Sequence, residues 1–175
     1  MEGEPDYRRG RTAAQGGCKD VGVRRAALAS SFLVLTALVG CANEPANTPT
    51  ACEQGSEALS KALERAPGPA RLGGRIPISD CLVPDQPAGD LMDFGSTAVE
   101  VATRLGREAT RPGPRGISAA IQAGYLVGAM KRGARETGGI HQVLIDRVRS
   151  AATNGITAPA KTHFEIGYEA GLRLG

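Results

Sequence analysis

The 175-residue sequence has few aromatic side chains, with no tryptophan, three tyrosines and three phenylalanines. Proteins use aromatic rings as platforms on which bases and sugars stack, so this composition argues against a site of that kind. Only two histidines occur, and their spacing does not match the i, i+4 pairing of metal ligands on a helix. The sequence also lacks a Gly-x-Ser-x-Gly elbow, a Ser-x-x-Lys motif and a phosphate-binding loop. We therefore predict no catalytic residue, no metal site and no cofactor.

The net charge excludes a further class of partner. Residues 1–40 contain six basic and four acidic residues, whereas residues 41–175 contain 15 basic and 14 acidic ones. The second segment therefore has a net charge of +1. Such a balance gives no overall attraction to nucleic acid or to an anionic surface, so we predict no nucleic-acid partner.

The sequence does contain one short apolar segment, at residues 26–39, without a charged side chain. Arg24 and Arg25 precede it and small residues end it, which is typical of a secretory signal peptide. The segment is shorter than the roughly 20 apolar residues that a membrane-spanning helix requires. It ends in Leu38, Val39, Gly40 and Cys41.

This ending resembles the lipobox of bacterial lipoproteins, and the resemblance covers residues 21–41. It implies that the thiol of Cys41 receives a diacylglycerol and that a peptidase then cuts the chain before Cys41. The lipid would hold the mature protein on the extracytoplasmic side of the cell membrane. The alternatives are an ordinary signal peptide that ends in a cysteine by chance, and a buried core helix.

Residues 1–20 are polar, rich in glycine and arginine, and show no apolar periodicity. In total 23 residues precede Arg24, whereas lipoprotein leaders usually begin a few residues before their arginines. Two explanations are open: the start is mis-assigned and lies at Val21 or Val23, or the basic region of the leader is long. Under both explanations this segment takes no part in the fold.

Four cysteines occur, and we assign them by location. Cys18 lies in the leader and Cys41 is the lipid acceptor, which leaves Cys52 and Cys81. Two cysteines in an oxidising compartment predict a disulfide, and the alternative is a pair of free thiols. Closing a loop of this length would stabilise the fold by roughly 3.5 kcal/mol.

Apolar residues recur at helical spacing after residue 50, and no segment alternates with period two. The sequence therefore predicts an all-α fold: a small compact bundle of about five helices after a cleaved N-terminal signal helix. Residues 1–40 are the signal peptide, residues 41–50 a lipid-anchored flexible tether, and residues 51–175 a single helical domain. The expected helices cover residues 50–66, 91–109, 117–136, 140–153 and 162–175.

Polar residues at fixed spacing predict where these helices begin. Thr50 with Glu53, and Thr162 with Glu165, have the spacing of capping boxes, and Asp90 is a candidate N-cap. Residues 67–90 are rich in proline and glycine and predict an irregular segment. The helix at 117–136 is apolar on nearly every side as far as Met130 and charged after it, so we expect it to be the central helix. In the next helix we expect four side chains to point inward: Ile140, Val143, Leu144 and Val148.

The pattern Gly-Tyr-x-x-Gly occurs twice, at residues 124–128 and 167–171. Glycines four apart share one helix face and leave it flat, so another backbone can approach closely. We expect the two helices to cross there with the tyrosines beside the contact. A self-association face and the floor of a ligand pocket are the alternatives. The residues concerned are Gly124, Tyr125, Gly128, Gly167, Tyr168 and Gly171.

Two classes of function remain after these exclusions. The first is a non-enzymatic binding or structural module, anchored to the membrane, that acts on an unknown envelope protein or small ligand. The second is an envelope enzyme, such as a hydrolase, which would require His141, His163 and an acidic residue to converge near Tyr125. The candidate binding residues are Tyr125, Tyr168, His141 and His163.

Overall fold

A computed structural model of the chain describes residues 47–137, 139 and 141–175. All structural statements below concern these residues. The signal segment, the lipobox and Cys41 lie outside them, as does Ile140.

Helices make up nearly all of the regular structure in the described part of the chain, which confirms the all-α prediction. A two-stranded hairpin interrupts them early in the domain. The elements in chain order are the 3-10 helix η1 (Thr50–Glu53), α1 (Gly55–Leu63), β1 (Arg71–Leu72), β2 (Ile76–Pro77), the 3-10 helix η2 (Ile78–Cys81), α2 (Ala88–Ala109), α3 (Pro114–Glu136), α4 (Gln142–Thr153) and α5 (Ala158–Leu174).

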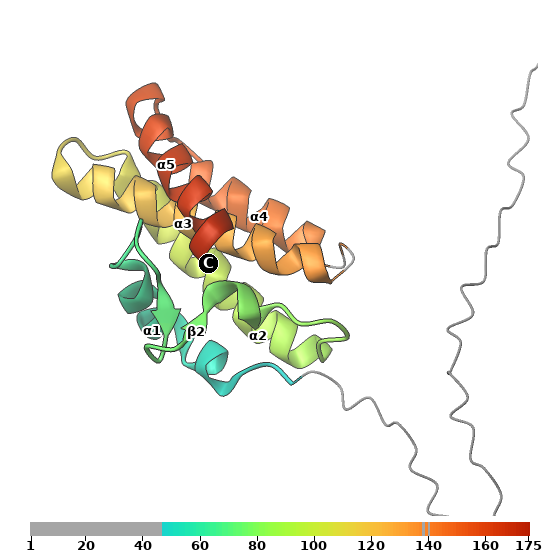
Figure 1. Ribbon diagram of the computed structural model, residues 1–175. Helices are drawn as coiled ribbons and strands as arrows, with labels where there is room; N and C mark the ends of the chain where they lie inside the picture. Colours follow the sequence, from blue (N-terminus) through green and yellow to red (C-terminus); the bar gives the residue numbers. More distant parts are fainter. Residues whose placement is uncertain (1–46, 138, 140) are drawn as a thin grey trace, which may run out of the picture. The chain divides into compact units, whose positions relative to one another are not determined.

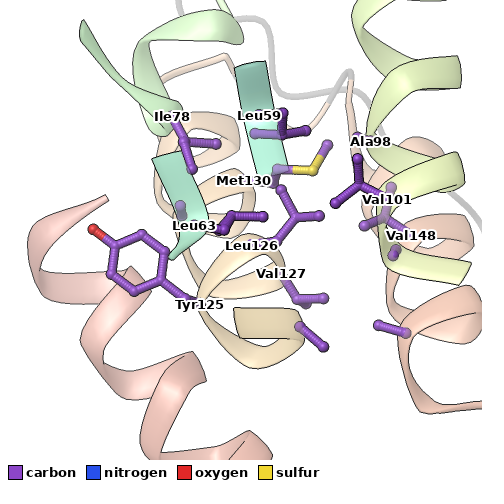
Figure 2. Packing of buried hydrophobic residues seen from close by; sticks show 14 of the residues in the cluster. Leu59, Leu63, Ile78, Ala98, Val101, Tyr125, Leu126, Val127, Met130 and Val148 are labelled. Atoms are coloured by element: carbon purple, nitrogen blue, oxygen red, sulfur yellow. The ribbon is translucent and has the colours of Figure 1, made fainter. Parts of the chain in front are cut away.

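Helix α3 is the centre of the bundle, as the sequence predicts. Every residue from Ala123 to Met130 is buried, because α2, α4, α5 and η2 pack around this helix. Figure 1 shows α3 and α5 side by side, with α4 next to them. In Figure 2 the core side chains of α3 meet Leu59 and Leu63 of α1, Val101 of α2 and Val148 of α4.

The repeated glycines bring α3 and α5 into backbone contact. A Cβ atom built on Gly124 would overlap the carbonyl oxygen of Phe164, and one on Gly128 would overlap that of Tyr168. From the other side, Gly167 and Gly171 contact the backbone of α3 in the same way. The predicted tight crossing is therefore present. Within one chain α3 and α5 cover each other's glycine faces, so self-association through these glycines would require the two helices to separate.

The predicted helix starts are wrong in three places, and no side-chain cap forms at any of them. Thr50 and Glu53 belong to a 3-10 turn, which ends because Gly55 has a positive φ of 79°. Helix α2 begins after Pro87, so Asp90 lies within its first turn. Helix α5 begins at Ala158, four residues before Thr162, because Pro159 fits the first turn of a helix.

The irregular segment contains a short hairpin that the sequence pattern did not reveal. Strands β1 and β2 have two residues each, too few for an alternating pattern to be visible. Gly73, Gly74 and Arg75 connect the strands, and the two glycines have φ values of 54° and 75°. Two successive positive φ angles are typical of the type I′ turn that joins tight hairpins.

The disulfide between Cys52 and Cys81 is present and joins η1 to η2, with 5.6 Å between the two Cα atoms. Both cysteines are buried. The bond therefore holds the hairpin segment against the start of the domain.

Candidate functional site

A groove of about 630 Å³ separates part of α2 from the start of α4. Its lining is mainly apolar, with a few polar and charged side chains. The lining consists of Leu91, Met92, Gly95, Ser96, Val99 and Glu100 from α2, and of His141, Val143, Leu144 and Arg147 from the α4 side.

The groove exists because α2 and α4 are close at one end and apart at the other. A Cβ on Gly106 would lie 2.8 Å from the carbonyl oxygens of Ala151 and Ala152, so the two backbones nearly touch there. Eleven residues earlier, the nearest atom to a Cβ on Gly95 is a side-chain carbon of Leu144, at 3.1 Å. At this end a leucine side chain, and no backbone, fills the space between the helices.

Two large apolar side chains of the lining are unusually exposed. Met92 is 73% exposed and Val143 is 72% exposed. The prediction that Val143 points inward is therefore wrong, and Leu144 is only half-buried. The inward face of α4 is formed by Ile145, Val148 and Ala152, which turns Val143 towards solvent.

His141 supplies a buried polar group to the groove lining, with only 1% of its surface exposed. Its Nδ1 lies 2.9 Å from the hydroxyl of Thr137, and that hydroxyl donates to the carbonyl of Ala134. The Thr137 oxygen must therefore accept from Nδ1–H, which leaves the electron pair on Nε2. Burial lowers the pKa of His141, so the neutral ring is favoured.

Charged side chains occur at the groove edge, where Glu100 and Arg147 line it from opposite helices. Next to them, Gln142 accepts a hydrogen bond from Lys131 and donates one to Asp146, both at 2.7 Å. This chain of contacts fixes the first turn of α4 against α3.

Tyr125 does not belong to this groove. It is fully buried, and its hydroxyl oxygen accepts a hydrogen bond from the backbone N–H of Ala70 at 3.1 Å. Burial raises the pKa of Tyr125, while the hydrogen bond from Ala70 acts in the opposite direction. Its place in the structure is a packing position between α3 and the segment before the hairpin.

Tyr168 and His163 lie in other places. The guanidinium of Arg149 lies over the ring of Tyr168, 4.8 Å from its centre, which is a cation–π arrangement. His163 lines a separate depression of about 350 Å³ beside Gly116 and Ile117, at the start of α3. His141 is next to Thr137, at the opposite end of that helix. At 1.5 Å per residue, about 30 Å of helix separates the two ends.

The histidines therefore do not converge, and the geometry that a site at His141, His163 and Tyr125 requires is not formed. No group of three or more His, Cys, Asp or Glu side chains in the described ranges is arranged to hold a metal ion. None of the helices described has the length and hydropathy of a membrane span.

Comparison of the chain with protein-family models, with curated proteins and with solved structures finds no match. The function must therefore be argued from the groove itself.

The sequence offered only a weak signal for this groove. Met92 and Val99 are seven residues apart, so they share a side of α2 that lies next to the core stripe. Such a second stripe is visible in the sequence. That it faces Val143 across an open space depends on the angle between α2 and α4, which contacts far apart in the chain determine.

Proposed function

We propose that this protein is a bacterial lipoprotein, acylated at Cys41, whose helical domain is a non-enzymatic module that binds a small apolar ligand between α2 and α4. The observation that carries the ligand proposal is the groove with Met92 and Val143 exposed on its two sides. Exposed apolar surface in a concave site is typical of ligand binding, because water leaves it favourably.

The dimensions and polarity of the groove favour a small molecule. Its volume of about 630 Å³ lies within the roughly 300–1,000 Å³ of small-molecule sites. Such sites are mainly apolar with a few polar groups that orient the ligand. Here the acceptor Nε2 of neutral His141 matches a ligand with an apolar body and one N–H or O–H donor.

The start of the folded domain is compatible with a lipid anchor at Cys41. Thr48 is buried, and its hydroxyl oxygen accepts a hydrogen bond from the side-chain amide of Gln86 at 2.9 Å. Thr48 is seven residue steps after Cys41, a distance of at most about 25 Å when the chain is extended. A lipid on Cys41 would therefore keep the start of the domain close to the membrane surface.

The ligand proposal is tested with N-phenyl-1-naphthylamine, an apolar fluorescent probe with one N–H donor. Val143→Asp should weaken probe binding about tenfold or more, because it places a carboxylate on the groove wall. Ile166→Asp is the matched control, since Ile166 is also an exposed apolar residue, on α5 and away from the groove. Equal binding by the two variants, or no binding by the wild-type chain, would refute the site.

The anchor is tested by labelling cells with radioactive palmitate. Cys41→Ser should abolish the label and release the protein from the membrane fraction. Cys18→Ser is the control, because it removes another cysteine of the leader and should leave the label unchanged. A labelled Cys41→Ser protein in the membrane fraction would show that the lipobox interpretation is wrong.

A further inference from the structure

A second depression, of about 560 Å³, lies between α1 and the hairpin, and its side chains are mainly polar. Three of the lining residues are basic and one is acidic, so this small region has a local charge of +2. That charge exceeds the net charge of +1 over residues 41–175. The lining consists of Gln54, Glu57, Ala58, Lys61, Ala62, Arg65, Arg71, Gly73 and Gly74.

The fold itself brings the three basic residues together. Lys61 lies in the last turn of α1, and Arg65 follows it by four residues in a turn that continues the helical hydrogen bonds. Arg71 comes from β1, and its guanidinium donates a hydrogen bond to the carbonyl of Arg75 across the hairpin at 3.0 Å. This bond orients the guanidinium, which keeps further N–H groups for another partner.

The structure provides little internal compensation for these charges. None of the three basic side chains forms an ion pair with an acidic side chain of the described residues. Lys61 in α1 and Arg65 in the turn after it line the same depression, and like charges held close together repel each other. Convergence of unpaired cations in a depression therefore costs stability, and a bound anion would compensate that cost.

We propose that this depression binds a phosphate group that carries neighbouring hydroxyls. An arginine fork matches two phosphate oxygens, and a lysine adds a point charge. Glu57 and Gln54, at the α1 side, supply acceptors for hydroxyl groups next to the phosphate. This phosphate site is independent of Cys41 and of the apolar groove.

The test uses the full-length chain and titration calorimetry with glycerol phosphate and with inorganic phosphate. The triple variant Lys61→Gln/Arg65→Gln/Arg71→Gln should weaken glycerol phosphate binding at least tenfold. The control replaces one lysine and two arginines that are exposed and line none of the depressions described above: Lys161→Gln/Arg107→Gln/Arg135→Gln. Its affinity should stay within twofold of wild type. No binding by the wild-type chain, or equal losses in both variants, would overturn the proposal.

The variant Glu57→Gln tests whether the depression recognises the hydroxyl groups of the ligand or only attracts anions through its basic side chains. Removing this negative charge should strengthen binding of inorganic phosphate but lower the preference for glycerol phosphate, because an acceptor for the hydroxyls is weakened. If the affinities for both anions increased equally, the proposed contact between Glu57 and the hydroxyls would be refuted.

A lipid headgroup and a soluble metabolite could both supply this chemistry, and vesicles distinguish them. The wild-type chain and the control variant should bind phosphatidylglycerol vesicles more strongly than phosphatidylcholine vesicles, and the triple variant should lose that difference, if the source is a headgroup. Binding of glycerol phosphate without any preference for phosphatidylglycerol would support a soluble ligand. Both results keep the phosphate site, whereas absence of glycerol phosphate binding refutes it.

Discussion

Two pairs of parallel helices in this domain use glycine to different effect. In the α3–α5 pair, glycines on both helices recur every four residues and bring the backbones together along the contact. In the α2–α4 pair, only Gly106 meets backbone, while Gly95 meets the side chain of Leu144. The first pair is closed and the second is open at one end. The difference shows that a groove can arise between two helices where a helical glycine faces a side chain of the neighbouring helix and not its backbone.

Glycine in a helix costs about 1 kcal/mol relative to alanine. In α3 and α5 the close backbone contact offsets that cost, which explains why the chain tolerates four glycines there. In α2 the absence of a side chain at Gly95 makes room for the Leu144 side chain, and both residues line the groove.

The largest loss of stability should come from disrupting the close contact between α3 and α5. Gly128→Leu places a side chain against the backbone of Tyr168, and we expect a loss of about 5 kcal/mol or more in the free energy of unfolding. Gly89→Leu in the first turn of α2 is the control, since nothing lies within 4 Å of a Cβ there. Urea unfolding measures both, and an unchanged midpoint for Gly128→Leu would contradict the closed pair.

The disulfide should affect stability without altering either helix pair. Cys52→Ala/Cys81→Ala frees the ends of a segment with a sequence separation of 29 residues. We expect a loss of roughly 3.5 kcal/mol from the restored freedom of the unfolded chain. Binding of the naphthylamine probe should persist at temperatures where the variant is folded. Loss of binding in the folded variant would mean that the groove depends on this covalent link.

His141, which lines the groove, should make the stability of the domain depend on pH. Because burial lowers the pKa of His141, the unfolded chain binds this proton first as the pH falls below about 6.5. The contribution of His141 to stability should therefore be complete above that pH and decline as the pH falls below it, by at most about 1.4 kcal/mol per pH unit. His141→Gln should reduce the decline. An unchanged slope in His141→Gln would mean that other groups cause it.

The smallest effect should come from Gly95→Ala. Its Cβ meets only the flexible end of Leu144, so we expect a change of about 1 kcal/mol or less. Gly128→Ala, whose Cβ meets backbone, should cost about 3 kcal/mol. If the two alanine variants unfolded at the same urea concentration, the contrast between the helix pairs would be wrong.

The sequence predicted the parts of the fold that depend on a local pattern, on a pair of cysteines or on a repeated motif. It predicted the helical class, the central position of α3, the disulfide, and the contact between the two Gly-Tyr-x-x-Gly segments. It failed at helix starts, where Pro87 and Pro159 outweighed Asp90 and Thr162. It also failed for Val143, because only tertiary packing determines how α4 is rotated about its axis.

The candidate site was predicted less well than the fold. Of the four candidate residues, only His141 lines the apolar groove, while Tyr125 and Tyr168 have packing roles. The groove depends on the unequal distances at Gly95 and Gly106, which no local pattern encodes.

The most direct test of a binding site at the open helix pair is a map of backbone amide NMR shifts during titration with N-phenyl-1-naphthylamine. The largest changes should fall on residues 91–100 of α2 and 141–147 at the start of α4. Saturable shifts centred on the α3–α5 contact, or no saturable shifts, would contradict the account.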